Sequence, residues 1–207
     1  MRLKVVKLLL LVTCLAPAVI LAVHGSHQTL GDNPVEAITY ETGDWTMILL
    51  LVTLAITPVR RLTGVNEIIS FRRMFGLLTF FYASLHFGTY VWLDKSFHCE
   101  RMSVDIGKRP FIWMGLCAFI LMIPLALTSN SLSIRRMGRR WKSLHTSVYA
   151  IAIAAVLHFV WMKRSEAKPY MYAVLFTWLL AWRVRVWRMK RRKMALSATQ
   201  TTLTAHS

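Results

Sequence analysis

The sequence predicts an all-α integral membrane protein, a bundle of six transmembrane helices with both termini in the cytoplasm. Three observations support this fold class. The chain is apolar, with a mean hydropathy of +0.46 and 17% charged residues, whereas soluble domains average about 25% charged residues. Its apolar residues gather in six long runs. Its basic residues gather in alternate connections between those runs.

The six runs define the predicted helices. Each approaches or reaches the roughly 17–25 residues that span a bilayer. Each is also continuously apolar, unlike the alternating strands of a membrane β-barrel. The predicted spans cover residues 8–23, 45–59, 74–93, 110–127, 144–162 and 169–187. Because the connections are too short to form a soluble domain, residues 1–193 are predicted to make one membrane domain.

The first span follows Arg2, Lys4 and Lys7, an arrangement that resembles a secretory signal. No Ala-x-Ala site closes the apolar run cleanly, so we interpret it as the first helix. Residues 24–44 are predicted to form an outer loop, with a short surface helix that starts at Asp32-Asn33-Pro34.

Pro110 suits the first turn of the fourth helix. The inner connection 128–142 is polar and basic. Residues 194–207 are rich in Ser and Thr, which predicts a disordered cytoplasmic tail. No internal repeat is evident.

The basic residues are unevenly distributed. With a cytoplasmic N-terminus, the inner segments hold 19 of the 26 Lys and Arg residues and one of the nine acidic residues. Such a bias toward the cytoplasmic side is the positive-inside pattern. Topology therefore explains the net charge of +17, and nucleic-acid binding is not expected. A secondary role for the basic face is docking of an anionic flavin or an acidic soluble partner.

Three histidines, His86, His145 and His158, lie inside predicted spans. A polar ring in hydrocarbon costs free energy unless something binds it. No Asp, Glu, Lys or Arg lies in the core of any span, which disfavours a proton pump or an ion-coupled transporter. Neutral imidazole is a good axial ligand for haem iron, and ligation by two histidines yields an electron carrier. The alternative is a hydrogen bond between helices that serves packing alone.

Depth pairs two of these histidines. His86 lies seven residues before the outer end of its predicted helix, which at 1.5 Å per residue is a depth of ~10 Å. His158 lies four residues before the outer end of its helix, at a depth of ~6 Å. The pair is therefore predicted to bind one haem iron from both sides. Arg109, at the outer start of the fourth helix, is predicted to meet a haem propionate.

His145 differs from the other two. It precedes His158 by thirteen residues, which on a straight helix turns the two rings about 140° apart. Its possible roles are contact with a flavin, a quinone or an inner cofactor, or an interfacial structural role. Arg72 occupies the position where a second helix-three ligand is expected, so a second haem lacks an obvious ligand.

Several motifs resemble the MsrQ (YedZ) family within the ferric-reductase-like transmembrane proteins. They are Phe71-Arg-Arg-Met-Phe-Gly-Leu, Ala83-Ser-Leu-His86, Ser143-Leu-His145-Thr-Ser-Val-Tyr149 and Leu157-His158-Phe-Val-Trp161. The resemblance implies six helices, haem b and FMN. It carries the family's haem histidines onto His86 and His158, with His145 as the third histidine of the pattern.

The resemblance also implies a function. Electrons are expected to pass from the quinone pool or a cytoplasmic flavin reductase, through this inner-membrane subunit, to a periplasmic molybdopterin-containing methionine sulfoxide reductase. That enzyme supports the repair of oxidised periplasmic proteins. Alternatives are a cytochrome b subunit of another dehydrogenase or ferric reductase, and a non-redox assembly factor or transporter.

Overall fold

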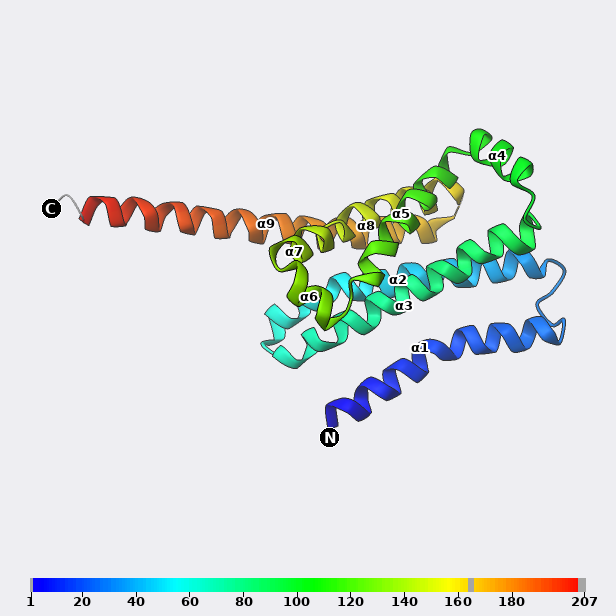
Figure 1. Cartoon of the computed structure of the whole chain (residues 1–207), viewed down its shortest axis with the longest axis horizontal. Coiled ribbons are helices and arrows are strands. Elements are labelled where there is room, and N and C mark those ends of the chain that lie inside the picture. Colours follow the sequence, from blue (N-terminus) through cyan, green and yellow to red (C-terminus); the bar gives the residue numbers. More distant parts are fainter. Residues whose placement is uncertain (1, 164–165, 205–207) are drawn as a thin grey trace.

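The computed structural model describes residues 2–163 and 166–204, and over these residues it is entirely helical, without strands (Figure 1). The elements in chain order are α1 (Arg2–Ser26), α2 (Pro34–Thr63), η1 (Asn66–Phe71), α3 (Arg72–Gly88), η2 (Thr89–Asp94), α4 (Cys99–Lys108), α5 (Pro110–Leu127), α6 (Ser131–Met137), α7 (Arg139–His145), α8 (Val148–Met162) and α9 (Ala167–Thr204).

Five helical stretches among the described residues are long and apolar enough to cross a membrane. They are Leu3–Ser26, Pro34–Thr63, Asn66–Asp94, Pro110–Leu127 and Arg139–Met162. The predicted sixth span, 169–187, lies in α9, which is not one of the five. The count of six spans and the cytoplasmic termini therefore stay predictions.

Helix α2 begins earlier than the sequence predicted. The side chain of Asn33 accepts a hydrogen bond from the backbone N–H of Glu36 at 3.3 Å, and Pro34 occupies the first turn. The expected surface helix is therefore not a separate element, because it continues without a break into the span predicted at 45–59. Gly64 ends α2 in a left-handed conformation, with its N–H bonded to the carbonyl of Arg60.

The predicted span 144–162 is also not one helix. Helix α7 ends at His145 and α8 begins at Val148. Between them, the hydroxyls of Thr146 and Ser147 donate to the carbonyls three residues earlier, at 2.5 and 2.6 Å. Such local side-chain bonds compete with the helical ladder. The straight-helix angle predicted between His145 and His158 therefore does not apply.

The bundle is built from two helix pairs, α2 with α3 and α5 with α8, and α9 packs against both α2 and α8 (Figure 1). One hydrophobic core joins the two pairs and includes Leu54, Ile151 and Phe176. Arg183 of α9 donates to the Tyr149 hydroxyl at 2.8 Å and to the Leu54 carbonyl at 3.1 Å. These bonds tie α9 to α8 and α2.

Helix α9 continues to Thr204, through residues 194–204 that the sequence predicted as a disordered tail. No Gly or Pro follows Pro169, so nothing in this stretch breaks a helix. Residues 205–207 of that predicted tail lie outside the described residues.

Helix α1 lies beside the bundle and is bent near its middle (Figure 1). Pro17 lies inside it and removes one backbone donor. The hydroxyl of Tyr82 on α3 inserts into the helical ladder at this point. It donates to the carbonyl of Cys14 at 2.6 Å and accepts from the N–H of Ala18 at 3.2 Å. The Tyr82 hydroxyl therefore supplies hydrogen-bond partners to two backbone groups at the bend and attaches α1 to α3.

We expect Tyr82→Phe to weaken this attachment, since the Cys14 carbonyl and the Ala18 N–H both lose a partner. The expected loss is about 1–3 kcal/mol, measured as a lower melting temperature in detergent and faster proteolysis between α1 and α2. Tyr90→Phe is the matched control, because that hydroxyl makes only a 3.4 Å contact with Asp105. Equal melting temperatures for the two variants would contradict the role of Tyr82.

Candidate functional site

A cavity of about 950 Å³ lies between the two helix pairs. This volume is near the upper end of the roughly 300–1,000 Å³ typical of ligand sites. Its walls come from α2, α3, α5 and α8, and residues of α4 and of the α8–α9 connection line it at one end. Figure 1 shows α4 and the α1–α2 connection at that end, and α6 and α7 at the other.

His86 from α3 and His158 from α8 meet inside this cavity. Their ring centroids are 6.1 Å apart and their planes are nearly perpendicular, at 84°. Both side chains line the cavity wall. The structure therefore brings together the two histidines that were paired from their predicted depths, although 72 positions separate them in the chain.

Each imidazole is held by one hydrogen bond to a helix backbone. Nδ1 of His86 lies 3.0 Å from the carbonyl oxygen of Thr39, and Nδ1 of His158 lies 2.7 Å from that of Phe111. A carbonyl only accepts, so each Nδ1 must carry the proton and donate it. In each ring Nε2 is then the nitrogen with a free lone pair. Metal-ligating histidines have the same tautomer and the same kind of supporting bond.

Charged residues surround the α4 end of the cavity. Arg109, the predicted propionate contact, lines the cavity and pairs with Asp105 through Nε and Oδ1 at 3.1 Å. Asp105 also pairs with Lys95 at 3.0 Å. Partial burial lowers the pKa of Lys95, but its hydrogen bonds to Asp94 and Asp105 raise that pKa by more. The net shift is upward, so the ammonium stays charged.

Two cationic side chains at this end were not predicted. Lys163 bonds to Glu166 at 2.5 Å and lies 3.8 Å from the centroid of the Tyr40 ring, and Lys168 pairs with Asp44. These partners raise the pKa of both lysines. Both lysines follow closely after the helix that carries His158, and this position in the sequence could have indicated that they lie near the site.

His145 lies in a second cavity of about 460 Å³, toward α6 and α7, and not with the other two histidines. Its Nε2 is 3.0 Å from the Thr128 hydroxyl, and its ring stacks on Trp141 with centroids 4.0 Å apart. Four cationic side chains also line this cavity. They are Arg72, Arg73, Lys142 and Arg183.

Aromatic side chains separate the two cavities. Phe80 lines the cavity of His145, whereas Phe87 and Phe119 line that of His86. The Phe119 ring stacks on Phe80 at 5.8 Å and on Phe87 at 4.8 Å between centroids. Met122 lines both cavities. An apolar wall, without a charged group among these four residues, therefore lies between the two sites.

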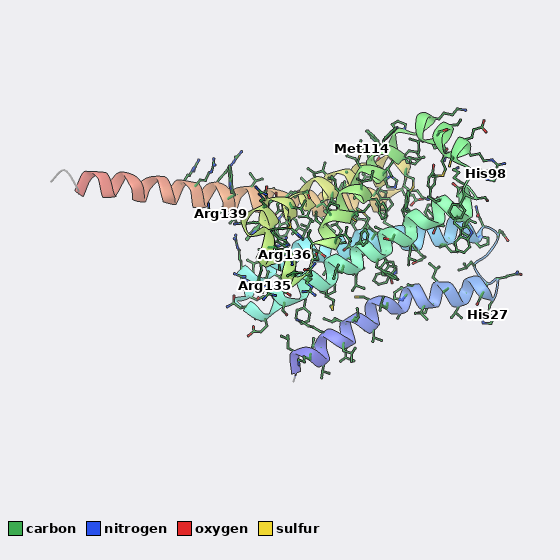
Figure 2. All side chains as sticks on the ribbon, in the orientation of Figure 1. His27, His98, Met114, Arg135, Arg136 and Arg139 are labelled. Carbon is green, nitrogen blue, oxygen red and sulfur yellow. The ribbon has the colours of Figure 1, made fainter. Side chains whose placement is uncertain are left out.

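The remaining polar side chains of interest lie elsewhere. Tyr82, one turn before His86, points away from the cavity into the contact with α1, whereas Tyr90 lines the cavity. Figure 2 shows His27 and His98 near the α4 end, outside the bundle, and Arg135 and other arginines around α6 and α7. The arginines around α6 and α7 thus lie at the opposite end of the bundle from α4.

Comparison with known proteins identifies the family. The model described as "Ferric reductase like transmembrane component" matches residues 42–156. A Bordetella pertussis protein, the "Protein-methionine-sulfoxide reductase heme-binding subunit MsrQ", is 47% identical over 170 residues, or 81% of this chain and 82% of that protein. The chain belongs to the MsrQ family. A Herminiimonas arsenicoxydans protein with the same description is 43% identical over 203 residues, covering 96% of this chain and 93% of its own length.

Membership of the MsrQ family also establishes where the chain resides. Its relatives are bacterial, and five of its helical stretches are apolar enough to span a bilayer, so the chain is a multi-pass protein of a bacterial inner membrane. No solved structure gave a significant match.

Proposed function

We propose that this chain is the haem-binding electron-transfer subunit of a methionine sulfoxide reductase system, with His86 and His158 as the axial ligands of one haem b. The pairing of these two imidazoles carries the proposal. They lie 6.1 Å apart in a cavity of ligand size, and both have Nδ1 bonded to a carbonyl. The MsrQ relatives are described as heme-binding subunits.

The separation of the rings suits one metal ion between them. Bonds between a metal and an imidazole nitrogen are about 2 Å long, which places two ring centres on opposite sides of one ion roughly 6 Å apart. When bound by two histidines, haem b cycles between ferric and ferrous iron and transfers single electrons without an open coordination site. Arg109, Lys163 and Lys168 lie at the cavity end where anionic propionates would meet cations.

The direction of transfer follows from the predicted topology. Arginines around α6 and α7 mark the cytoplasmic side by the positive-inside rule, so the His86/His158 cavity lies toward the periplasm. From a haem held in this cavity, electrons would pass to a periplasmic molybdopterin-containing methionine sulfoxide reductase. No protein group of the chain performs substrate chemistry in this scheme.

The basic cavity near His145 is proposed as the entry site for electrons. It combines four cations with the stacked rings of Trp141 and His145, and so suits an anionic aromatic molecule such as FMN. A flavin there would receive electrons from the quinone pool or from a cytoplasmic flavin reductase. The hydrogen bond between Nε2 of His145 and the Thr128 hydroxyl supports a positioning role for His145 rather than ligation of a second iron.

We expect His86→Ala and His158→Ala each to abolish the sharp α and Soret bands of the dithionite-reduced protein, because one axial ligand is lost. His145→Ala should leave these bands in place, because that side chain lines the other cavity, and His27→Ala should also leave them unchanged. The check is an optical spectrum of purified, folded protein with haem content per chain. Normal haem content in either ligand variant would refute the assignment. His158→Gly should regain a low-spin spectrum when imidazole is added.

For the basic cavity, we expect Arg73→Gln to reduce bound FMN without changing the haem spectrum, since the side chain lines the other cavity. The measurement is flavin released per purified chain, with Arg135→Gln as the control for general loss of inner positive charge. Equal flavin content in all three proteins would contradict a site in this cavity.

The family description favours one competing function, a ferric reductase. The two functions differ in the electron acceptor. We expect the reduced protein to be reoxidised rapidly by an oxidised periplasmic molybdopterin reductase, and slowly by ferric citrate at equal concentration, as followed by stopped-flow absorbance. The reverse order of rates would support the ferric reductase.

A further inference from the structure

The two histidines of the cavity occupy equivalent positions in a repeated unit. The pentapeptide Ala-x-Leu-His-Phe occurs at residues 83–87 and again at 155–159. Each histidine bonds to a carbonyl that lies 47 residues earlier in the chain. The expectation of no internal repeat was therefore wrong. The shared residues are few and are separated by dissimilar apolar sequence, so the repeat is apparent only when the contacts are known.

A glycine belongs to each unit. Gly43 follows the carbonyl residue Thr39 by four positions on α2, and Gly115 follows Phe111 by four positions on α5. In an α-helix the carbonyl of residue i accepts the N–H of residue i+4. A side chain at i+4 therefore lies next to that carbonyl. When residue i+4 is glycine, no side chain covers the carbonyl, and its second lone pair can accept a hydrogen bond from the imidazole.

Both histidine rings occupy the space that a side chain would need. A Cβ added at Gly43 would lie 3.2 Å from Nδ1 and Cε1 of His86. One added at Gly115 would lie only 2.8 Å from Nδ1 of His158 and 2.9 Å from its Cε1. In each case the crowded atoms include the nitrogen that bonds to the carbonyl. The added methyl group would therefore displace the ring and compete with its hydrogen bond.

Neither glycine is needed for backbone shape. Both lie inside helices, and the glycines with positive φ are Gly31, Gly64 and Gly138. Glycine inside a helix is destabilising relative to alanine. Gly76, on α3, would place an added Cβ 3.8 Å from its nearest neighbour, and Gly88 would meet nothing within 4 Å. Close contact with a histidine is therefore specific to Gly43 and Gly115.

We propose that Gly43 and Gly115 are positioning residues that determine the orientation of the two axial imidazoles. This inference rests on the proposed haem function. Each glycine lets one ring lie against a helix backbone, donate Nδ1–H to the carbonyl one turn earlier and direct Nε2 to the metal. The contact is tighter at Gly115, so the His158 side is the less tolerant of the two.

The test compares Gly115→Ala and Gly43→Ala with Gly76→Ala, in the full-length protein purified from membranes. Haem affinity, the low-spin EPR spectrum and the midpoint potential are measured. Loss of a group that supports a ligand typically lowers metal affinity 10–100-fold. We expect a loss of about tenfold or more for Gly115→Ala. For Gly43→Ala we expect retained haem with shifted EPR g values. Gly76 lines the cavity of His145 and not that of His86, so for Gly76→Ala we expect the haem affinity, g values and midpoint potential of the wild type.

The outcomes separate this inference from the proposed function. Wild-type protein that binds no haem would overturn both. A second outcome is that the wild type binds haem but Gly115→Ala and Gly43→Ala are both indistinguishable from Gly76→Ala. This outcome would overturn only the positioning role. Should Gly115→Ala not accumulate in membranes, the EPR comparison of Gly43→Ala with Gly76→Ala decides.

A second measurement distinguishes positioning from general packing. In a His158→Gly background, added imidazole is not attached to the chain and is free to adjust its position. Adding Gly115→Ala to that background should leave haem affinity in the presence of imidazole unchanged. A further tenfold loss there would show that the methyl group acts on the cavity rather than through His158, and would overturn the inference.

Discussion

The cavity depends on the hydrogen bonds that two imidazoles donate to helix carbonyls. An imidazole in an apolar bundle is stable only when its N–H has a partner. Thr39 and Phe111 supply that partner from the neighbouring helix of each pair. The bonds select the tautomer, leave Nε2 free and bring both rings into one space. The cavity thus lies where α2–α3 meets α5–α8.

The charge distribution places two unlike sites along the bundle. The site of His86 and His158 is apolar along its length, with paired cations and carboxylates at one end. The site of His145 is lined by three arginines and a lysine, and among its lining residues there is no carboxylate. Stacked phenylalanines lie between them. An anionic carrier at one site and a haem at the other would account for both environments.

Much of this architecture could be predicted. Hydrophobic run length located five spans, and the fourth predicted span matches α5 at both ends. The pairing of His86 with His158 was predicted because helix rise converts sequence position into depth. Boundaries that depend on local hydrogen bonds were harder. Asn33 starts α2 early, and the hydroxyls of Thr146 and Ser147 separate α7 from α8.

The sequence by itself determined the helical membrane class, the basic side of the bundle and the histidines at depth, because these follow from composition and period along one chain. Only the tertiary structure decided which backbone atoms the histidines bind, which glycines lie under the rings and where His145 points. Those features depend on contacts between separate helices, among them the two bonds from a histidine to a carbonyl 47 positions earlier. Such contacts arise from packing, and the apolar residues around them carry no local signal of their partners.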